Sequence, residues 1–392
     1  MPDKLVRVLI VDDSLTARAV LMRLLQEDDR IEVVGRAVDG LDALEQVKQL
    51  RPDVVTLDIE MPRLDGIATL ERLMAETPTP VVMVSSLTRK GADATMRALE
   101  IGAVDFVEKP TRNGVIVGAS VGALGLAEKV VAAAGARVRR WRPTSQPHPA
   151  TQPAERSAPA VSATAASMGA GAASPRALRF AGAPAPARSV GPGSWLRRTV
   201  VIGSSTGGPQ ALHQLLVSLP GDLGVPIVVV QHMPPGFTRS LAERLDSLSA
   251  LHVSEARPGD RLENGHVLLA PGGHHLLFDA QGVVHLGDGP AECGVRPAIN
   301  VTMESVVRAR GFSIIGVVLT GIGTDGTRGA QLIHDAGGTV LAQDEESSVV
   351  YGMPRSVAQA GLADEVHPLD QMAEAVVRWC SPGAAVKVRR AG

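Results

Sequence analysis

Residues 200–209 read Val-Val-Ile-Gly-Ser-Ser-Thr-Gly-Gly-Pro, a short apolar run that leads directly into a turn of small residues. Such a run indicates a buried strand, and the glycines followed by proline mark a tight turn into a helix. Residues 6–14 repeat this order as Val-Arg-Val-Leu-Ile-Val-Asp-Asp-Ser, ahead of a helical pattern over 14–26. A strand that turns into a helix is the repeating unit of a parallel sheet. Both halves of the chain are therefore predicted to be α/β.

Outward from these two stretches, apolar runs and amphipathic segments alternate through both halves. In the first half, strands are predicted at 6–11, 33–34, 54–57, 81–84 and 106–107, with a last helix over 120–134. In the second half, strands are predicted at 200–202, 227–230, 267–270, 314–319 and 339–342. A turn at 279–282 between two short apolar runs predicts an antiparallel hairpin inserted in the second sheet. We expect two doubly wound parallel-sheet domains.

The stretch between the two halves has a different composition. Residues 143–194 hold 9 Pro and 15 Ala with few large apolar side chains, which predicts a disordered linker. The charge also divides here. Residues 1–135 hold 16 basic and 21 acidic side chains, residues 136–197 hold 9 and 1, and residues 198–392 hold 14 and 19. We predict domains over 1–125 and 198–385, joined by a terminal helix and linker over 126–197.

Composition excludes several classes for this chain of 392 residues. Aromatic residues are only 2%, too few for stacking platforms on single-stranded nucleic acid. Cys293 and Cys380 provide neither a disulfide framework nor a zinc site. The chain starts without a secretory signal and has no apolar run long enough to cross a bilayer, so we expect a cytoplasmic protein without membrane insertion. The basic segment 137–142 lacks a helix-turn-helix pattern, so nucleic acid is not expected as a partner.

Acidic side chains stand where predicted strands of the first half end. Asp12 and Asp13 end the first strand, and Asp58 ends the third. Because ligands bind beyond the carboxyl ends of parallel strands, we expect these carboxylates to meet, with Lys109 and Ser85 beside them. Oxygen ligands without a soft partner suit Mg²⁺. A carboxylate, a metal ion, a lysine and a hydroxyl together indicate a phosphoryl-acceptor site.

This half of the chain resembles the response-regulator receiver family. The resemblance covers about residues 4–125 and rests on the motifs V-L-I-V-D-D-S, L-D-I-E-M-P-R-L-D-G, V-S-S and E-K-P. It implies a flavodoxin-like fold in which Asp58 accepts phosphate from a histidine kinase. It also implies that Asp13, Asp58 and the backbone carbonyl of Glu60 hold Mg²⁺, with Asp12 as the second member of the acidic pocket. The residues that correspond to the family's switch are Ser85, Phe106 and Lys109.

A serine, a histidine and an aspartate follow three predicted strands of the second half. Ser205 is the centre of a G-x-S-x-G pattern at a strand-to-helix turn, a context that exposes a nucleophilic hydroxyl. His232 ends the next strand, and Asp325 lies in the glycine-rich loop after the strand at 314–319. Together they supply a nucleophile, a base and an orienting carboxylate. His274 or His275 is an alternative base. A dinucleotide-binding loop is less favoured because G-x-G-x-x-G is absent.

The second half resembles the catalytic domain of the chemotaxis protein-glutamate methylesterase family (CheB type) over residues 198–380. The motifs are I-G-S-S-T-G-G, Q-H-M-P-P-G-F-T-R-S, A-P-G-G-H-H, L-T-G-I-G-T-D-G and Y-G-M-P-R-S. The resemblance implies a Rossmann-like serine hydrolase with Ser205 as nucleophile, His232 as base and Asp325 as orienter. Its substrates would be glutamate methyl esters on the cytoplasmic helices of chemoreceptors, and some members also deamidate glutamine. No cofactor is expected for the esterase.

The loop that carries Asp325 departs from the family pattern at two positions. Ile322 stands where the family often has Met, and Thr324 stands where it often has Asn. The backbone N–H groups near Thr206 and Ile322 are the expected oxyanion donors. A receiver ahead of an esterase implies control of the esterase, and the resemblance to the family implies that phosphorylation of Asp58 opens the catalytic cleft. Two alternatives stay open but are less favoured: an adaptor protein whose esterase has decayed, and a DNA-binding regulator.

Overall fold

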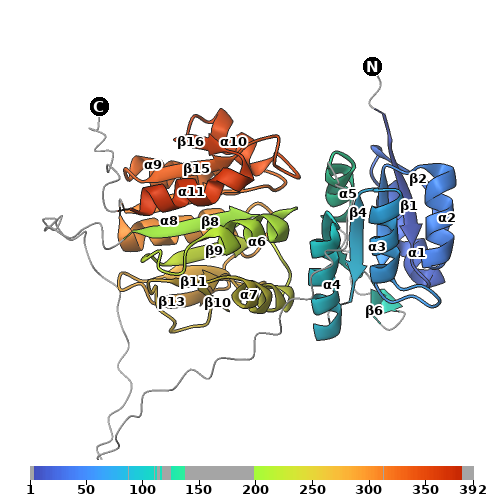
Figure 1. The fold of residues 1–392 in the computed structure, drawn as a ribbon, viewed down its shortest axis with the longest axis horizontal. Coiled ribbons are helices and arrows are strands. Elements are labelled where there is room, and N and C mark those ends of the chain that lie inside the picture. The colour runs from blue at the N-terminus through green and yellow to red at the C-terminus, as the bar shows by residue number, and fades with distance from the viewer. Residues whose placement is uncertain are drawn as a thin grey trace, which may run out of the picture. The chain divides into compact units, whose positions relative to one another are not determined.

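The computed structural model describes residues 4–86, 88–109, 111–112, 115–116, 125–136, 198–311 and 313–381, which form two α/β domains (Figure 1). The predicted linker over 143–194 and the basic segment 137–142 lie outside the described residues. None of the described helices is long and apolar enough to span a bilayer.

The first domain is a five-stranded sheet in the order β2-β1-β3-β4-β5, with every neighbouring pair parallel. Its strands are β1 Val6–Val11, β2 Ile31–Ala37, β3 Val54–Asp58, β4 Val81–Ser85 and β5 Asp105–Glu108. Its helices are α1 Leu15–Gln26, α2 Gly40–Leu50, α3 Gly66–Glu76, α4 Arg89–Ile101 and α5 Leu126–Ala134. A short antiparallel pair, β6 Thr111–Arg112 and β7 Val115–Ile116, follows β5. All five predicted strands are present, although β2 is longer than predicted.

Local sequence explains where the helices of the first domain begin. The side chain just before each of the first four helices accepts a hydrogen bond from a backbone N–H of the first turn, and these capping residues are Ser14, Asp39, Asp65 and Thr88. Helices α1 and α5 pack on one face of the sheet and α2, α3 and α4 on the other. The carboxyl ends of the strands are therefore left open between the loops.

The second domain is a seven-stranded sheet in the order β10-β11-β9-β8-β14-β15-β16, with every neighbouring pair parallel. Its strands are β8 Thr199–Ser204, β9 Ile227–Gln231, β10 His252–Glu255, β11 His266–Leu269, β14 Ile314–Val318, β15 Thr339–Gln343 and β16 Glu365–His367. Its helices are α6 Gly208–Ser218, α7 Phe237–Leu248, α8 Ile299–Arg310, α9 Thr327–Asp335, α10 Met353–Gln359 and α11 Leu369–Cys380. The five predicted strands form its interior, and β10 and β16 add an edge on either side.

Two apolar layers enclose the second sheet. Alternate residues of β8 face opposite layers: Ile202 packs with α6, α7 and α11, whereas Val201 packs with α8, α9 and α10. The predicted hairpin is present as β12 His275–Phe278 and β13 Val284–Gly287, which pair with each other and not with the main sheet. The hairpin packs on α8 through β12.

Candidate functional sites

Ser205 occupies the turn between β8 and α6. Its backbone N–H donates to the Thr320 carbonyl at 3.0 Å, and its carbonyl accepts from Gly208 N–H at 2.7 Å and from Gln231 Nε2 at 2.9 Å. Gly207 has a φ of 76°, which only glycine adopts readily. A side chain at Gly208 would place its Cβ 2.0 Å from the Gln231 Oε1 atom. The small residues of the motif therefore permit a sharp turn with the serine half-buried at the sheet edge.

His232 follows β9, which pairs in parallel with β8. The register places Gln231 beside Ser204, and the His232 N–H donates to the Ser204 carbonyl at 3.1 Å. His232 and Ser205 are thus the next residues at the ends of two adjacent strands. The structure brings them to the same edge, as predicted. Within the described residues the Ser205 hydroxyl makes no hydrogen bond to His232. Such bonds are often loose before a substrate binds.

Asp325 reaches the histidine from the loop after β14. Its Oδ2 atom lies 2.8 Å from His232 Nε2, and both side chains are more than nine-tenths buried. A carboxylate can only accept, so Nε2 carries the proton and Nδ1 keeps a lone pair. Among the described residues, neither His274 nor His275 bonds to Asp325. His274 Nδ1 pairs with Asp288 at 2.6 Å, and His275 bonds to the backbone of Pro290 and Ala298. The structure therefore favours His232 over the alternative base.

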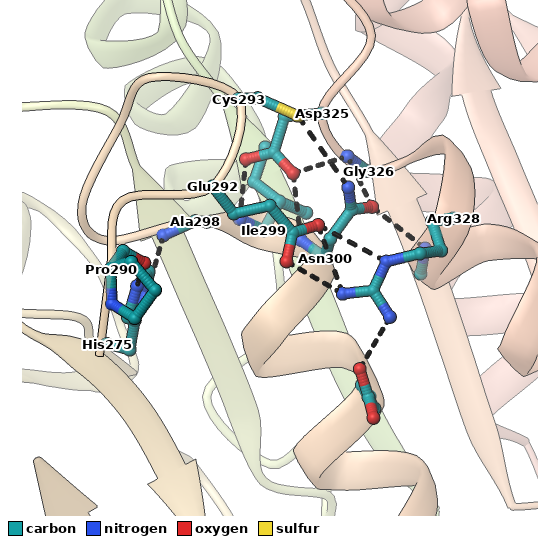
Figure 2. A network of polar contacts seen from close by, with 12 residues as sticks. His275, Pro290, Glu292, Cys293, Ala298, Ile299, Asn300, Asp325, Gly326 and Arg328 are labelled. Atoms are coloured by element: carbon teal, nitrogen blue, oxygen red, sulfur yellow. Dashed lines mark hydrogen bonds and ion pairs between the residues drawn. The ribbon is translucent and has the colours of Figure 1, made fainter. Parts of the chain in front are cut away.

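The Asp325 carboxylate also accepts three backbone N–H groups (Figure 2). Ile299 donates to Oδ2 at 2.7 Å, and Asn300 and Gly326 each donate to Oδ1 at 2.9 Å. Burial alone would raise the pKa of Asp325, but the bond from His232 and the N–H groups of Asn300 and Ile299 hold that pKa below its usual value. The aspartate is therefore kept ionised beside the imidazole.

Two backbone N–H groups remain available next to Ser205. Within the part of the chain that the structure describes, neither Thr206 nor Ile322 donates its N–H to another group. A side chain at Gly321 would place its Cβ 2.7 Å from the Ser205 Cβ atom, so the backbone that leads to Ile322 passes close to the serine. Both positions suit donors to an oxyanion that forms at Ser205. The Ile322 side chain takes no part in such a contact, because the donor is its backbone.

The first domain brings its predicted acidic residues together at the carboxyl edge of its own sheet. One carboxylate oxygen from each of Asp12, Asp13 and Asp58 lies within 4.8 Å of the others. Lys109 Nζ lies 2.7 Å from an Asp58 oxygen and 3.0 Å from Asp12 Oδ2. Lys109 is the ion-pair partner of Asp12 Oδ2, so a single lysine faces this cluster of carboxylates. Clustered carboxylate oxygens without a soft ligand fit a hard cation such as Mg²⁺.

Charge repulsion and burial dominate the electrostatics of this acidic pocket. Burial raises the pKa of Asp58 to about 6, and the neighbouring Asp12 adds to the rise, whereas Lys109 and the Glu60 N–H oppose it. Burial likewise raises the pKa of Asp12. The Glu60 backbone, predicted as a ligand through its carbonyl, thus lies close enough to Asp58 for its N–H to lower the pKa of that carboxyl. An extra cation would relieve the strain of these buried charges.

The predicted switch residues lie on the strands next to the acidic pocket. Ser85, at the end of β4, is fully buried and donates its hydroxyl hydrogen bond to the Gly91 carbonyl at 3.2 Å. Phe106 is buried in β5, and its ring lies with its centroid 4.5 Å from that of Phe237, the first residue of α7. The aromatic switch position therefore contacts the helix that follows the His232 loop.

The two domains belong to one compact unit, and further contacts join them. The Thr206 hydroxyl, next to Ser205, donates to Asp105 at the start of β5. Gln210 Nε2 in α6 donates to the backbone carbonyls of Leu99 and Ala103, the latter at 3.0 Å. Sequence patterns had not indicated Asp105 or Gln210, because neither belongs to a motif with its own chemistry.

Comparisons with known proteins agree with both resemblances. The family model described as "CheB methylesterase" matches residues 200–376, and "Response regulator receiver domain" matches residues 8–119. A protein-glutamate methylesterase/protein-glutamine glutaminase of Symbiobacterium thermophilum is 50% identical over 379 residues, or 96% of this chain and 98% of the relative. A protein-glutamate methylesterase/protein-glutamine glutaminase 2 of Pseudomonas aeruginosa is 43% identical over 376 residues, or 95% and 96%. The crystal structure of the Thermotoga maritima CheB methylesterase catalytic domain shares 47% identity, covering 46% of this chain and 97% of that one, with a TM-score of 0.45.

Proposed function

The chain belongs to the CheB methylesterase family and begins with a response regulator receiver domain, and from this we propose that it is a phosphorylation-regulated serine hydrolase. Its substrates are methyl esters of glutamate side chains on chemoreceptor cytoplasmic helices, as the resemblance implies. The names of its relatives add glutamine side chains as a second substrate. The enzyme would act in the cytoplasm, where those helices and the histidine kinase meet it.

One observation carries this proposal above the others. The buried, ionised Asp325 accepts a hydrogen bond from His232 Nε2. His232 and Ser205 in turn follow two strands that pair with each other. That order supplies an orienting carboxylate, a base and a nucleophile from three separate loops. Burying a charge costs free energy unless the charge is paired and hydrogen-bonded. An adaptor without esterase activity would gain nothing from a buried aspartate with so many donors around it. The arrangement therefore favours a working enzyme over an adaptor.

The reaction begins with proton transfer from the serine. His232 Nδ1 takes the Ser205 Oγ proton as Oγ attacks the ester carbonyl carbon, and the carbonyl oxygen gains the negative charge. The N–H groups of Thr206 and Ile322 would receive that oxyanion. Asp325 stabilises the imidazolium that has formed, because its charge is fixed 2.8 Å from Nε2.

The second half of the reaction returns the enzyme to its starting state. The imidazolium donates its Nδ1 proton to the methoxy oxygen, so the C–O bond breaks and methanol leaves. His232 then takes a proton from water as the water oxygen attacks the acyl-enzyme carbonyl carbon, and it gives that proton to Ser205 Oγ as the bond between the acyl carbon and Oγ breaks. The products are a glutamate carboxylate and free serine. With a glutamine substrate the same sequence releases ammonia in place of methanol.

The acidic pocket is proposed to control this reaction through phosphorylation of Asp58 by a histidine kinase. The carboxylates of Asp12, Asp13 and Asp58 and the Glu60 carbonyl would hold Mg²⁺, which when bound neutralises charge on the transferred phosphoryl group. Lys109 lies 2.7 Å from Asp58 and would pair with the phosphate. Ser85, buried near the end of β4, would move toward the phosphate and let Phe106 change its position.

Contacts between the domains support a route by which that movement would reach the esterase. Phe106 lies against Phe237, and its neighbour Asp105 accepts from Thr206, one of the proposed oxyanion donors. A shift of β5 would therefore alter the surroundings of Ser205 directly. We infer that the unphosphorylated receiver holds the esterase in a less active state.

The proposal is tested most sharply by Ser205→Ala with Ser204→Ala as the matched control. Loss of a triad nucleophile costs on the order of 10⁶-fold in rate. Ser204 only donates its hydroxyl to Gln231 Oε1 at 2.7 Å, so its loss should cost far less. The measurement is methanol release from methylated receptor in the presence of a small-molecule phosphodonor, with fluorophosphonate labelling as a second readout. Near wild-type methanol release by Ser205→Ala would contradict the assignment.

A further inference from the structure

The two adjacent histidines of the A-P-G-G-H-H motif have different surroundings. His274 is about half exposed and pairs with Asp288. His275, the first residue of β12, is only 3% exposed and lies between the loop after β13 and the start of α8 (Figure 2). A histidine buried this completely has a structural or catalytic role that its exposed neighbour does not share.

The hydrogen bonds of His275 fix its tautomer. The Ala298 N–H donates to Nδ1 at 3.2 Å, so Nδ1 must carry the lone pair. Nε2 lies 3.0 Å from the Pro290 carbonyl oxygen, which can only accept, so Nε2 carries the hydrogen. Both ring nitrogens of the neutral imidazole are thus engaged with backbone. His275 has no free nitrogen with which to act as a base toward a substrate.

Ala298, whose N–H donates to His275, stands at the start of α8, and the first N–H groups of this helix donate to Asp325. Ala298 is the N-cap residue of α8, and its methyl side chain cannot accept the orphan N–H groups of the first turn. The next two N–H groups, those of Ile299 and Asn300, go to the two oxygens of Asp325. Three successive N–H groups at the start of α8 therefore end on side chains from elsewhere, the first on His275 and the next two on Asp325.

The other side of the imidazole holds the loop that precedes α8. Pro290 lies in this loop, and Glu292 further along it pairs with Arg328 of α9 at 2.8 Å. His275 is the group that joins this loop to the first residue of the α8 turn. Removing the ring would take this partner from both the Ala298 N–H and the Pro290 carbonyl, and with it one restraint on the first turn of α8. Asn300 Oδ1 would still accept from Gly326 and Gly329, so the turn would loosen rather than unfold and would shift the two N–H groups that Asp325 accepts.

We propose that His275 is a positioning residue for the reaction, acting through the first turn of α8 on the orientation of Asp325 and hence of His232. The inference rests on the triad of the proposed function and adds a residue that never touches the substrate. Its effect falls on kcat, because a misdirected Asp325 weakens stabilisation of the imidazolium in the transition state while leaving ground-state contacts unchanged.

The test compares His275→Leu, His275→Asn and the control His274→Leu in the full chain. His275→Leu keeps an apolar filling of similar size and removes both hydrogen bonds. It should lower kcat by about 10- to 100-fold with KM within about twofold, since small misplacements from a distance cost up to about that much. His275→Asn can offer a carbonyl oxygen near the Nδ1 position and should recover part of the loss. His274→Leu should leave kcat within about twofold.

A double-mutant comparison separates positioning from a general loss of structure. In an Asp325→Ala background, His275→Leu should lower kcat by less than about twofold more, because residues that act as one unit are non-additive. Thermal melting reports the folded fraction, and rates are compared per folded molecule.

Two results would overturn the inference: equal kcat for His275→Leu and His274→Leu per folded molecule, or a full additional loss in the Asp325→Ala background. Failure of the proposed function looks different, because Ser205→Ala would then stay active. An inactive Ser205→Ala with a normal His275→Leu would refute only the role of His275.

Discussion

The acidic pocket of the receiver and the serine site of the esterase lie at equivalent places, the carboxyl edge of a parallel sheet, and each buries an aspartate almost completely. The two sites shift the pKa of the buried aspartate in opposite directions. Asp325 accepts four hydrogen bonds and its pKa is lowered, whereas Asp58 faces a second carboxylate and its pKa is raised to about 6. A fully bonded carboxylate is a fixed charge that orients a neighbour. An under-compensated one is ready to bind a cation and to react.

The largest expected effect tests the fixed charge of the esterase. Asp325→Asn keeps the shape but removes the charge, and its amide would offer N–H where His232 Nε2 now donates. In the serine protease that first defined this triad, the same change lowers kcat about 10⁴-fold because the wrong tautomer results. We expect a loss of about that order in methanol release. A loss below about tenfold would mean that Asp325 does not orient His232.

Replacing the buried aspartate by asparagine should change the free energy of unfolding with opposite signs at Asp58 and at Asp325. Asp58 has an ordinary pKa of 3.8 and about 6 in the folded chain, so the folded state binds the extra proton between those values. Stability therefore falls as pH rises through that window, and the cost is fully present above about pH 6. Asp58→Asn should raise the free energy of unfolding of the receiver by about 1–3 kcal/mol at pH 7.

For Asp325 the folded pKa lies below 3.8, so its contribution is present above that pH and is lost as pH falls further. Asp325→Asn should lower the free energy of unfolding of the esterase by about 1–3 kcal/mol at pH 7, since a capping charge and its donors are lost. Urea unfolding of both variants between pH 4 and pH 8 measures the two signs. If both variants shift in the same direction, the contrast between the pockets is wrong.

Mg²⁺ should stabilise the wild-type receiver but not Asp58→Asn.

How far the sequence predicts each site follows from the range of the interactions involved. Asp12, Asp58, Ser205 and His232 each stand at the end of an apolar run, and a parallel sheet then brings strand ends together. These positions could be predicted from local pattern. The edge strands β10 and β16 were missed because they are short and half-buried, so they lack a continuous apolar run.

The supporting groups could not be predicted, because their signals are not local. Ala298 gives no cap signal at the start of α8. The groups that accept the first N–H groups of this helix, His275 for Ala298 and Asp325 for Ile299 and Asn300, lie more than 20 residues away on either side. Gln210 and Asp105 join the domains through backbone and hydroxyl groups that any sequence pattern would treat as surface. Motifs therefore located the chemistry, whereas the fold alone revealed what holds it in place.

The smallest expected effect concerns the link between the two sites. Gln210 Nε2 donates to the carbonyls of Leu99 and Ala103, and a net contribution of about 1 kcal/mol for each such bond is typical. Gln210→Ala should therefore weaken the hold of the unphosphorylated receiver and raise basal methanol release about 2- to 10-fold.

Gln214→Ala, on an exposed turn of the same helix, is the matched control and should leave the basal rate unchanged. With a small-molecule phosphodonor present, both variants should reach the wild-type rate, because in the proposed function phosphorylation releases the contact. Adding Asp58→Asn to Gln210→Ala should keep the raised basal rate and abolish the response to the phosphodonor. A Gln210→Ala basal rate equal to that of Gln214→Ala would show that these hydrogen bonds do not restrain the esterase. Control by the receiver would then have to act through other contacts, such as those of Asp105 and Phe106 or the hydrogen bond from Ser240 to Asp93.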